Sequence, residues 1–159
     1  MTIDKDYPYI SVSPDGEGEC KCCGKFVVEI KCPCSICETV PTSDNLPYLK
    51  KEKDENGENE IFLQRNHVYY AQIQDQMAVT GRDKAWFFVF TKHGHYLELI
   101  EFDKDYWCEI LENLIYSWKN FLAPVILGKQ IVTPNSTPST SSNQQIKKSK
   151  VSKNSTNKT

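Results

Sequence analysis

The chain has 159 residues, of which 39% are hydrophobic and 11% aromatic, and its formal net charge is −2. This length allows one modest hydrophobic core and is too short for two ordinary domains. No stretch approaches the length of a membrane-spanning helix, and residues 1–6 lack the basic start and apolar centre of a secretory signal. We therefore expect a soluble intracellular protein, nuclear or cytoplasmic, and not an integral membrane or exported one.

The near-neutral charge conceals two unlike parts. Residues 129–159 contain six lysines and no acid, so residues 1–128 keep 13 basic against 21 acidic residues, a net charge of −8. The later part is rich in Ser, Thr, Asn, Gln and Lys, and it cannot bury enough apolar surface to fold. We expect a domain over 1–128 and a disordered tail over 129–159. Because phosphate binding relies on Lys and Arg, DNA would need a local basic groove or the tail.

The first predicted elements are two short strands. Residues 9–13 are expected to form a strand that enters the turn Pro14-Asp15-Gly16, with residues 25–31 as its hairpin partner. Side chains alternate along a strand, so Glu29 and Lys31 share one face while Ile30 is expected to turn into the core. An Asp15 at the end of the preceding strand would bring its carboxylate close to Glu29.

This arrangement suits a particular chemistry. Two carboxylates offer the hard oxygen ligands that Mg²⁺ or Mn²⁺ prefers, and Lys31 would stand beside the metal. A cation that activates water, together with an adjacent amine, is suited to phosphodiester hydrolysis. The alternative is purely structural, because an Asp-Gly turn followed by an amphipathic strand occurs in many sheets.

Seven cysteines provide a competing hypothesis. Cys20-x-x-Cys23 and Cys34-x-x-Cys37 have the spacing of zinc knuckles and could form a cysteine-rich interaction module. The extended residues between the two pairs would hold them roughly 20 Å apart, which argues against one shared zinc and leaves a smaller site at one end open. The cysteines to be tested for zinc are Cys20, Cys22, Cys23, Cys32, Cys34 and Cys37.

The rest of the chain alternates between helices and strands. Prolines and a charge run predict an irregular loop over residues 38–59, followed by a helix over 65–80. Strands are expected over 86–91 and 96–102, and an amphipathic helix over 104–122, ended by Pro124. The predicted core consists of Val28, Ile30, Phe87, Val89, Leu97, Leu99, Leu111 and Leu114.

Five segments together carry a family resemblance. They are Ser13-Pro14-Asp15-Gly16, Glu29-Ile30-Lys31-Cys32-Pro33, and residues 67–77, 84–90 and 95–103. In this order they resemble the YqaJ-like viral recombinase family, relatives of the phage lambda exonuclease within the PD-(D/E)xK nucleases, over roughly residues 7–127. The resemblance implies an α/β fold with a mixed sheet flanked by helices, the restriction-endonuclease-like core. It also implies that the first helices of that core are missing, so we expect an N-terminally truncated member.

The resemblance further implies an activity and a site. It implies a metal-dependent deoxyribonuclease of exonuclease type, which acts on DNA in recombination or repair. Asp15, Glu29 and the carbonyl of Ile30 match the ligands of Mg²⁺ or Mn²⁺. Lys31 matches the catalytic lysine, and Gln72 matches a glutamine that supports the site. A catalytically inactive DNA-associated protein stays open as an alternative, because the missing upstream helices would supply a further acidic residue.

Overall fold

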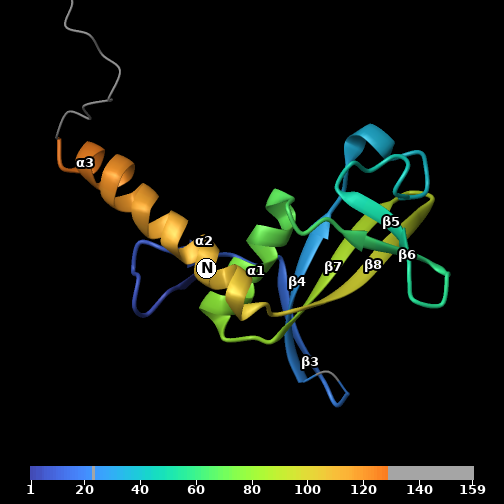
Figure 1. Cartoon of the computed structure of the whole chain (residues 1–159), viewed down its shortest axis with the longest axis horizontal. Coiled ribbons are helices and arrows are strands. Elements are labelled where there is room, and N and C mark those ends of the chain that lie inside the picture. The colour runs from blue at the N-terminus through green and yellow to red at the C-terminus, as the bar shows by residue number, and fades with distance from the viewer. Residues whose placement is uncertain (23, 129–159) are drawn as a thin grey trace, which may run out of the picture.

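The computed structural model describes residues 1–22 and 24–128. Figure 1 shows a curved sheet with helices on one side, and a long C-terminal helix that leads away from it. The strands are β1 (Thr2–Ile3), β2 (Ser11–Val12), β3 (Gly16–Cys20), β4 (Gly24–Lys31), β5 (Leu49–Lys53), β6 (Asn59–Leu63), β7 (Lys84–Thr91) and β8 (Gly94–Glu101). The helices are α1 (Val68–Thr80), α2 (Lys104–Ser117) and α3 (Ala123–Ile126), with a 3-10 turn at Cys34–Ile36 and a π-helical turn at Trp118–Leu122.

The main sheet has the strand order β3-β4-β7-β8. β4 and β7 are parallel, while β3 with β4 and β7 with β8 are antiparallel. A parallel pair needs a crossover connection, and α1 lies on the connection between β4 and β7. The fold is thus of the mixed α/β class, as the sequence predicts. Two small antiparallel pairs, β1 with β2 and β5 with β6, accompany the sheet.

Helix α1 has clear start and stop signals. His67 caps its N-terminus, because the imidazole Nδ1 accepts a hydrogen bond from the Tyr69 N–H at 3.2 Å. Gly81 ends the helix in the left-handed conformation at φ 66°, which glycine adopts without steric cost. The predicted helix is confirmed, although it begins at Val68 and not at residue 65.

The core lies between α1 and one face of the sheet. Phe87 is fully buried at the centre of β7, and the rings of Tyr48, Tyr69 and Tyr96 surround it with centroids 6.1 to 6.4 Å away. Such aromatic contacts add to the stabilisation that apolar burial provides. The buried hydrophobic residues of this cluster are Val27, Leu46, Tyr48, Leu49, Leu63, Ile73, Met77, Ala85, Phe87, Val89 and Ile100.

The opposite face of the sheet is apolar but largely uncovered. Ile30 is 41% exposed, Phe90 50% and Leu97 49%, so the prediction that Ile30 and Leu97 belong to the core is wrong. Strand alternation sends Val27, Glu29 and Lys31 toward α1 and sends Ile30 outward. Phe87 and Val89 are confirmed as core residues. Val28, Leu99, Leu111 and Leu114 are only partly buried.

Three further predictions are corrected by the structure. The hairpin partner of β4 is β3, with Gly16 opposite Val28, whereas residues 9–13 contain only the two-residue β2. The region 38–59 is not an irregular loop, because it contains β5 and the start of β6. Pro124 does not end the last helix, because α2 continues through the π-helical turn into α3, and Pro124 lies in the first turn of α3.

Helix α2 begins at a side-chain cap and contacts the N-terminal segment. The Asp103 carboxylate accepts a hydrogen bond from the Tyr106 N–H at 2.9 Å. Tyr9 stacks on Trp118 just beyond α2, with ring centroids 4.7 Å apart and planes 2° from parallel. Within the described part of the chain, no helix combines the length and apolarity needed to cross a bilayer.

Candidate active site

The centre of the site is a buried carboxylate. Glu29 lies in the middle of the sheet on β4, faces α1, and is only 2% exposed. Its Oε1 accepts hydrogen bonds from Lys31 Nζ at 2.5 Å and from Gln72 Nε2 at 2.8 Å. Its Oε2 accepts a hydrogen bond from Gln76 Nε2 at 2.7 Å. A buried carboxylate requires such partners, because it loses its hydration on folding.

Lys31 is held from three directions. Besides its ion pair with Glu29, its Nζ donates to Gln72 Oε1 at 3.2 Å and lies 4.2 Å from the centroid of the Tyr69 ring. The ring face attracts a cation, and the amide oxygen accepts one of its three protons. The lysine side chain is still 20% exposed, so the ammonium reaches the edge of the site. The prediction that Glu29 and Lys31 share one face is confirmed, although that face is the inner one.

Two glutamines one helical turn apart complete the cluster. Gln72 and Gln76 are i and i+4 on α1 and therefore lie on the same helix face, toward Glu29. Gln72 is a site residue that the sequence predicts, whereas Gln76 is not, although its i, i+4 spacing from Gln72 is a signal for it. Gln74 points elsewhere, since its side-chain NH₂ donates to the Glu101 carbonyl at 3.0 Å and its side-chain oxygen accepts from the Asp103 N–H at 2.8 Å.

Asp15 approaches the same strand from its edge. Its Oδ2 accepts a hydrogen bond from the Ile30 N–H at 2.8 Å. Continuing the antiparallel register by one residue beyond Gly16 and Val28 places Asp15 opposite Glu29, and opposed residues present their side chains on the same face. The N–H and C=O of one strand residue point the same way, so the Ile30 carbonyl also faces the Asp15 edge.

Comparison with models of known protein families shows the family to which the chain belongs. The model of the YqaJ-like viral recombinase domain matches residues 1–83, which is 83 of the 159 residues and more than half of the chain. The chain belongs to the YqaJ-like viral recombinase domain family. The matched segment includes Asp15, Glu29, Lys31, Gln72 and Gln76 and ends just before β7. No curated protein and no solved structure matches the chain significantly.

Asp75, next to Gln76 on α1 of this YqaJ-like domain, has a carboxyl group whose pKa is raised. Burial, together with repulsion from Asp4, raises the pKa of Asp75 from 3.8 to about 6. The folded state therefore holds the proton more tightly than the unfolded state does. Ionisation between about pH 4 and pH 6 consequently lowers the free energy of unfolding, and the loss is complete above pH 6.

This shift predicts a pH-dependent effect of one substitution. We expect Asp75→Asn to raise the free energy of unfolding by about 1 to 3 kcal/mol at pH 8, because it removes a buried charge. The gain should shrink toward zero near pH 4. Urea unfolding of both proteins with EDTA present, from pH 4 to 8, measures it. A gain of equal size at both ends of the range would exclude ionisation of Asp75 as its cause.

Cys20 and Cys22 lie at one end of β4, and Cys32, Cys34 and Cys37 lie at the other. Cys20 ends β3 opposite Gly24, and its Sγ lies 3.2 Å from that of Cys22, whereas Cys34 and Cys37 follow the other end of β4. The eight residues of β4 span about 26 Å at 3.3 Å per residue. Among residues 1–22 and 24–128, no group of three or more His, Cys, Asp or Glu side chains is placed to hold a metal ion. Cys23 lies outside the described residues.

We therefore predict that metal does not hold this YqaJ-like domain together. Purified protein should contain less than about one tightly bound zinc per chain, and a chelator should leave its circular dichroism nearly unchanged. The physical reason is the apolar cluster around Phe87, which does not depend on thiolate ligands. Elemental analysis and chelator titration measure both quantities. Stoichiometric zinc with chelator-induced unfolding would instead support a cysteine-based module.

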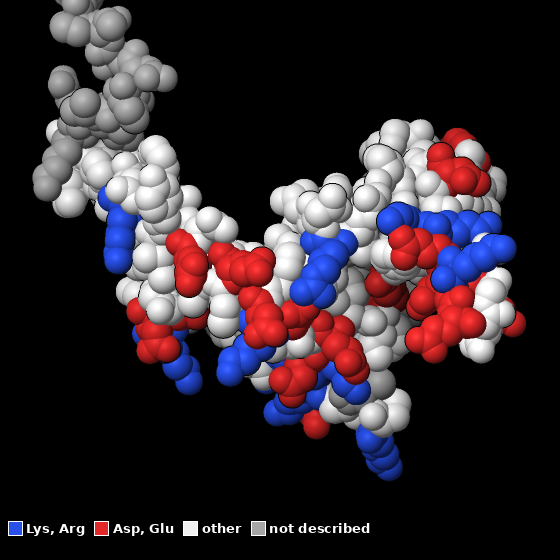
Figure 2. All heavy atoms as spheres, in the orientation of Figure 1, with Lys and Arg blue, Asp and Glu red and all other residues white. Residues whose placement is uncertain are grey.

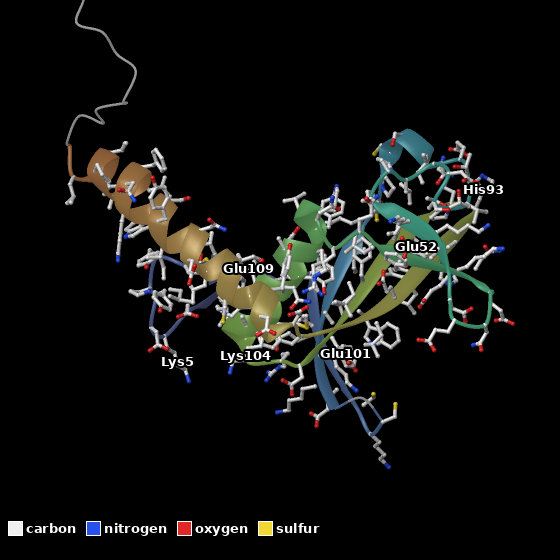
Figure 3. The ribbon with its side chains drawn as sticks, viewed as in Figure 1. Lys5, Glu52, His93, Glu101, Lys104 and Glu109 are labelled. Atoms are coloured by element: carbon white, nitrogen blue, oxygen red, sulfur yellow. The ribbon has the colours of Figure 1, made fainter. Side chains whose placement is uncertain are left out.

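Carboxylates gather on one face of the domain, with Lys and Arg side chains among them (Figure 2). Figure 2 shows carboxylates across the middle of the molecule, and Figure 3 places Glu101 and Glu109 there, with Lys104 between them along the chain. An open cleft of about 480 Å³ on this side is lined by Tyr70, Glu98, Ile100, Glu101, Phe102, Asp103, Lys104 and Asp105. The lining of this cleft contains four carboxylates against one lysine, a balance that disfavours phosphate groups there.

Proposed function

We propose that this YqaJ-like chain is a metal-dependent DNA nuclease of exonuclease type, which acts in DNA recombination or repair. Residues 1–128 would form its restriction-endonuclease-like, PD-(D/E)xK domain. The observation that carries the proposal is the cluster of Glu29, Lys31 and Gln72 at the centre of a mixed sheet. The family match at the same residues supports it.

The donor set fits a hard divalent cation. Asp15 and Glu29 supply carboxylate oxygens, and the Ile30 carbonyl faces the edge where Asp15 lies. Oxygen ligands of this kind select Mg²⁺ or Mn²⁺ over softer metals. These three residues would hold the cation. When bound, it would neutralise charge on the phosphodiester and lower the pKa of an attacking water.

The protein's own groups would prepare the site for that reaction. Lys31 places a positive charge at a fixed point, and its ammonium can donate to a phosphate oxygen as negative charge develops there. Gln72 bonds to both members of the Glu29 and Lys31 pair and so fixes the distance between carboxylate and ammonium. Gln76 holds the second oxygen of Glu29, which limits rotation of the carboxylate. Such preorganisation lowers the barrier without further rearrangement.

The test is cleavage of linear duplex DNA by the purified chain. We expect degradation with Mg²⁺ or Mn²⁺, none with EDTA, and resistance of closed circular DNA if ends are required. Glu29→Gln should remove cleavage, whereas Glu101→Gln, which alters an exposed carboxylate on β8, should not.

This assay distinguishes the proposed nuclease from an inactive DNA-binding protein and from a nuclease that uses other residues. DNA that binds without being cleaved under any metal would identify a catalytically inactive DNA-associated protein. Cleavage that persists in Glu29→Gln would place the chemistry at other residues.

A further inference from the structure

A second polar cavity lies behind the glutamine pair. It has a volume of about 280 Å³ and is lined by Ser11, Val12, Ser13, Gln72, Asp75 and Gln76. Gln72, Asp75 and Gln76 occupy positions i, i+3 and i+4 of α1 and so share one helix face. Ser11 and Ser13 come from the extended segment around β2 and are exposed. The cavity is therefore formed between α1 and the N-terminal segment.

The orientation of the Gln76 amide is fixed by Glu29. The Glu29 carboxylate only accepts hydrogen bonds, so the Gln76 group 2.7 Å from it must be the NH₂. The Gln76 carbonyl oxygen then points to the other side of the amide, away from Glu29. Gln76 is 2% exposed, and this oxygen is buried without a hydrogen-bond partner among the described residues. A buried acceptor in this state calls for a hydrogen-bonded water or a bound ion.

Asp75, which also lines this cavity, carries a second buried acceptor. Its Oδ1 is also buried without a hydrogen-bond partner in the described part of the chain. Asp4 adds further negative potential at this carboxylate. Of the described residues that line the cavity, none is Lys, Arg or His. Two buried oxygen acceptors and a net negative charge favour a cation and disfavour an anion or an apolar molecule.

We propose that this cavity binds a hydrated divalent cation through Asp75 Oδ1 and Gln76 Oε1, separate from the site at Asp15 and Glu29. Its volume leaves room for the water that Mg²⁺ and Mn²⁺ retain, and the Ser11 and Ser13 hydroxyls are available to that water. A cation on Gln76 Oε1 polarises the amide and strengthens the hydrogen bond from its Nε2 to Glu29. The cation would thus help to hold Glu29 in position through Gln76. Only this effect on Glu29 rests on the proposed nuclease function.

The test measures Mn²⁺ binding to the full chain by electron paramagnetic resonance of the free ion. We expect Asp75→Asn to lose one bound Mn²⁺ per chain, or to bind it at least about tenfold more weakly, since it removes the only charge among the proposed ligands. Glu29→Gln should retain this ion. Asp44→Asn, which alters an exposed carboxylate elsewhere, serves as the matched control. Asp75→Ala tests the same loss with a second side chain.

A second readout is thermal stability. Mn²⁺ should raise the melting temperature of the wild-type chain and of Glu29→Gln more than that of Asp75→Asn. Equal Mn²⁺ binding by wild type and Asp75→Asn would overturn the proposal and leave water as the occupant. If the cavity binds methylguanidinium in an Asp75-dependent way but does not bind Mn²⁺, the proposed cation site is also overturned. The cavity would then accept a basic side chain of a partner protein. If Mn²⁺ binding depends on Asp75 but the chain does not cleave DNA, the proposed nuclease function is refuted and the proposed cation site is not.

Discussion

Lys31→Ala is expected to lower the rate of DNA cleavage at least about 100-fold, because it removes a preorganised charge from the reaction site. The fold should remain, since Glu29 keeps its hydrogen bonds from Gln72 and Gln76. Single-turnover cleavage of linear duplex DNA measures the rate, and circular dichroism verifies folding.

Lys50→Ala is the control for Lys31→Ala. Lys50 lies on β5, its side chain is 55% exposed, and its ion pair is with Glu52 at the surface. The cleavage rate of this variant should equal that of the wild type, because screened surface pairs contribute little. If Lys31→Ala cleaved DNA at the wild-type rate, another residue would have to provide the positive charge.

Phe87→Ala should cost about 3 to 5 kcal/mol of unfolding free energy, the range for large-to-small substitutions of buried aromatic residues. The side chain is fully buried, and its removal would leave a cavity bordered by Tyr48, Tyr69 and Tyr96. Urea denaturation followed by fluorescence measures the change.

Phe90→Ala provides the matched control on the same strand. Phe90 is 50% exposed on the opposite face of the sheet, so its removal should cost less than about 1 kcal/mol. A loss at Phe90 as large as that at Phe87 would mean that the outer face is covered in solution. Equal small losses at both positions would contradict the placement of the core on the α1 side.

The sequence predicts α2 and the strands around Phe87 well, because hydrophobic residues dominate one face of each of these segments. It fails at β3 and β5, whose sequences Gly-Glu-Gly-Glu-Cys and Leu-Lys-Lys-Glu-Lys contain few apolar residues. Such strands form through backbone pairing with a neighbour that is already in place, and local propensity does not indicate them. The turn chemistry at Gly81 and the cap at Asp103 are, by contrast, local signals.

In β4, Glu29 and Lys31 face the core and Ile30 faces outward, and the sequence of β4 alone does not explain this orientation. Phe26, Val28 and Ile30 lie on one face of β4, and Val27, Glu29 and Lys31 lie on the other. An amphipathic strand normally buries its more apolar face, which here is the face of Ile30. Here α1 presents Gln72 and Gln76 to the sheet, so the polar face finds hydrogen-bond partners when it is buried. Only the combination of strand and helix determines which face turns inward. Pairing of Glu29 with Lys31 was predictable because it depends only on a spacing of two residues.

The parallel pairing of β4 with β7 affects the order in which the chain folds. Val27 lies opposite Ala85, 58 positions later in the sequence (85 minus 27). By contrast, β7 and β8 are joined by a short turn, with Thr91 opposite Gly94. Loop-closure entropy favours the near contact first, so we expect the hairpin of β7 and β8 to form early and β4 to dock late. Glu29 therefore meets Gln72 and Gln76 only near the end of folding, and a chain released before that step would expose an unpaired β7 edge.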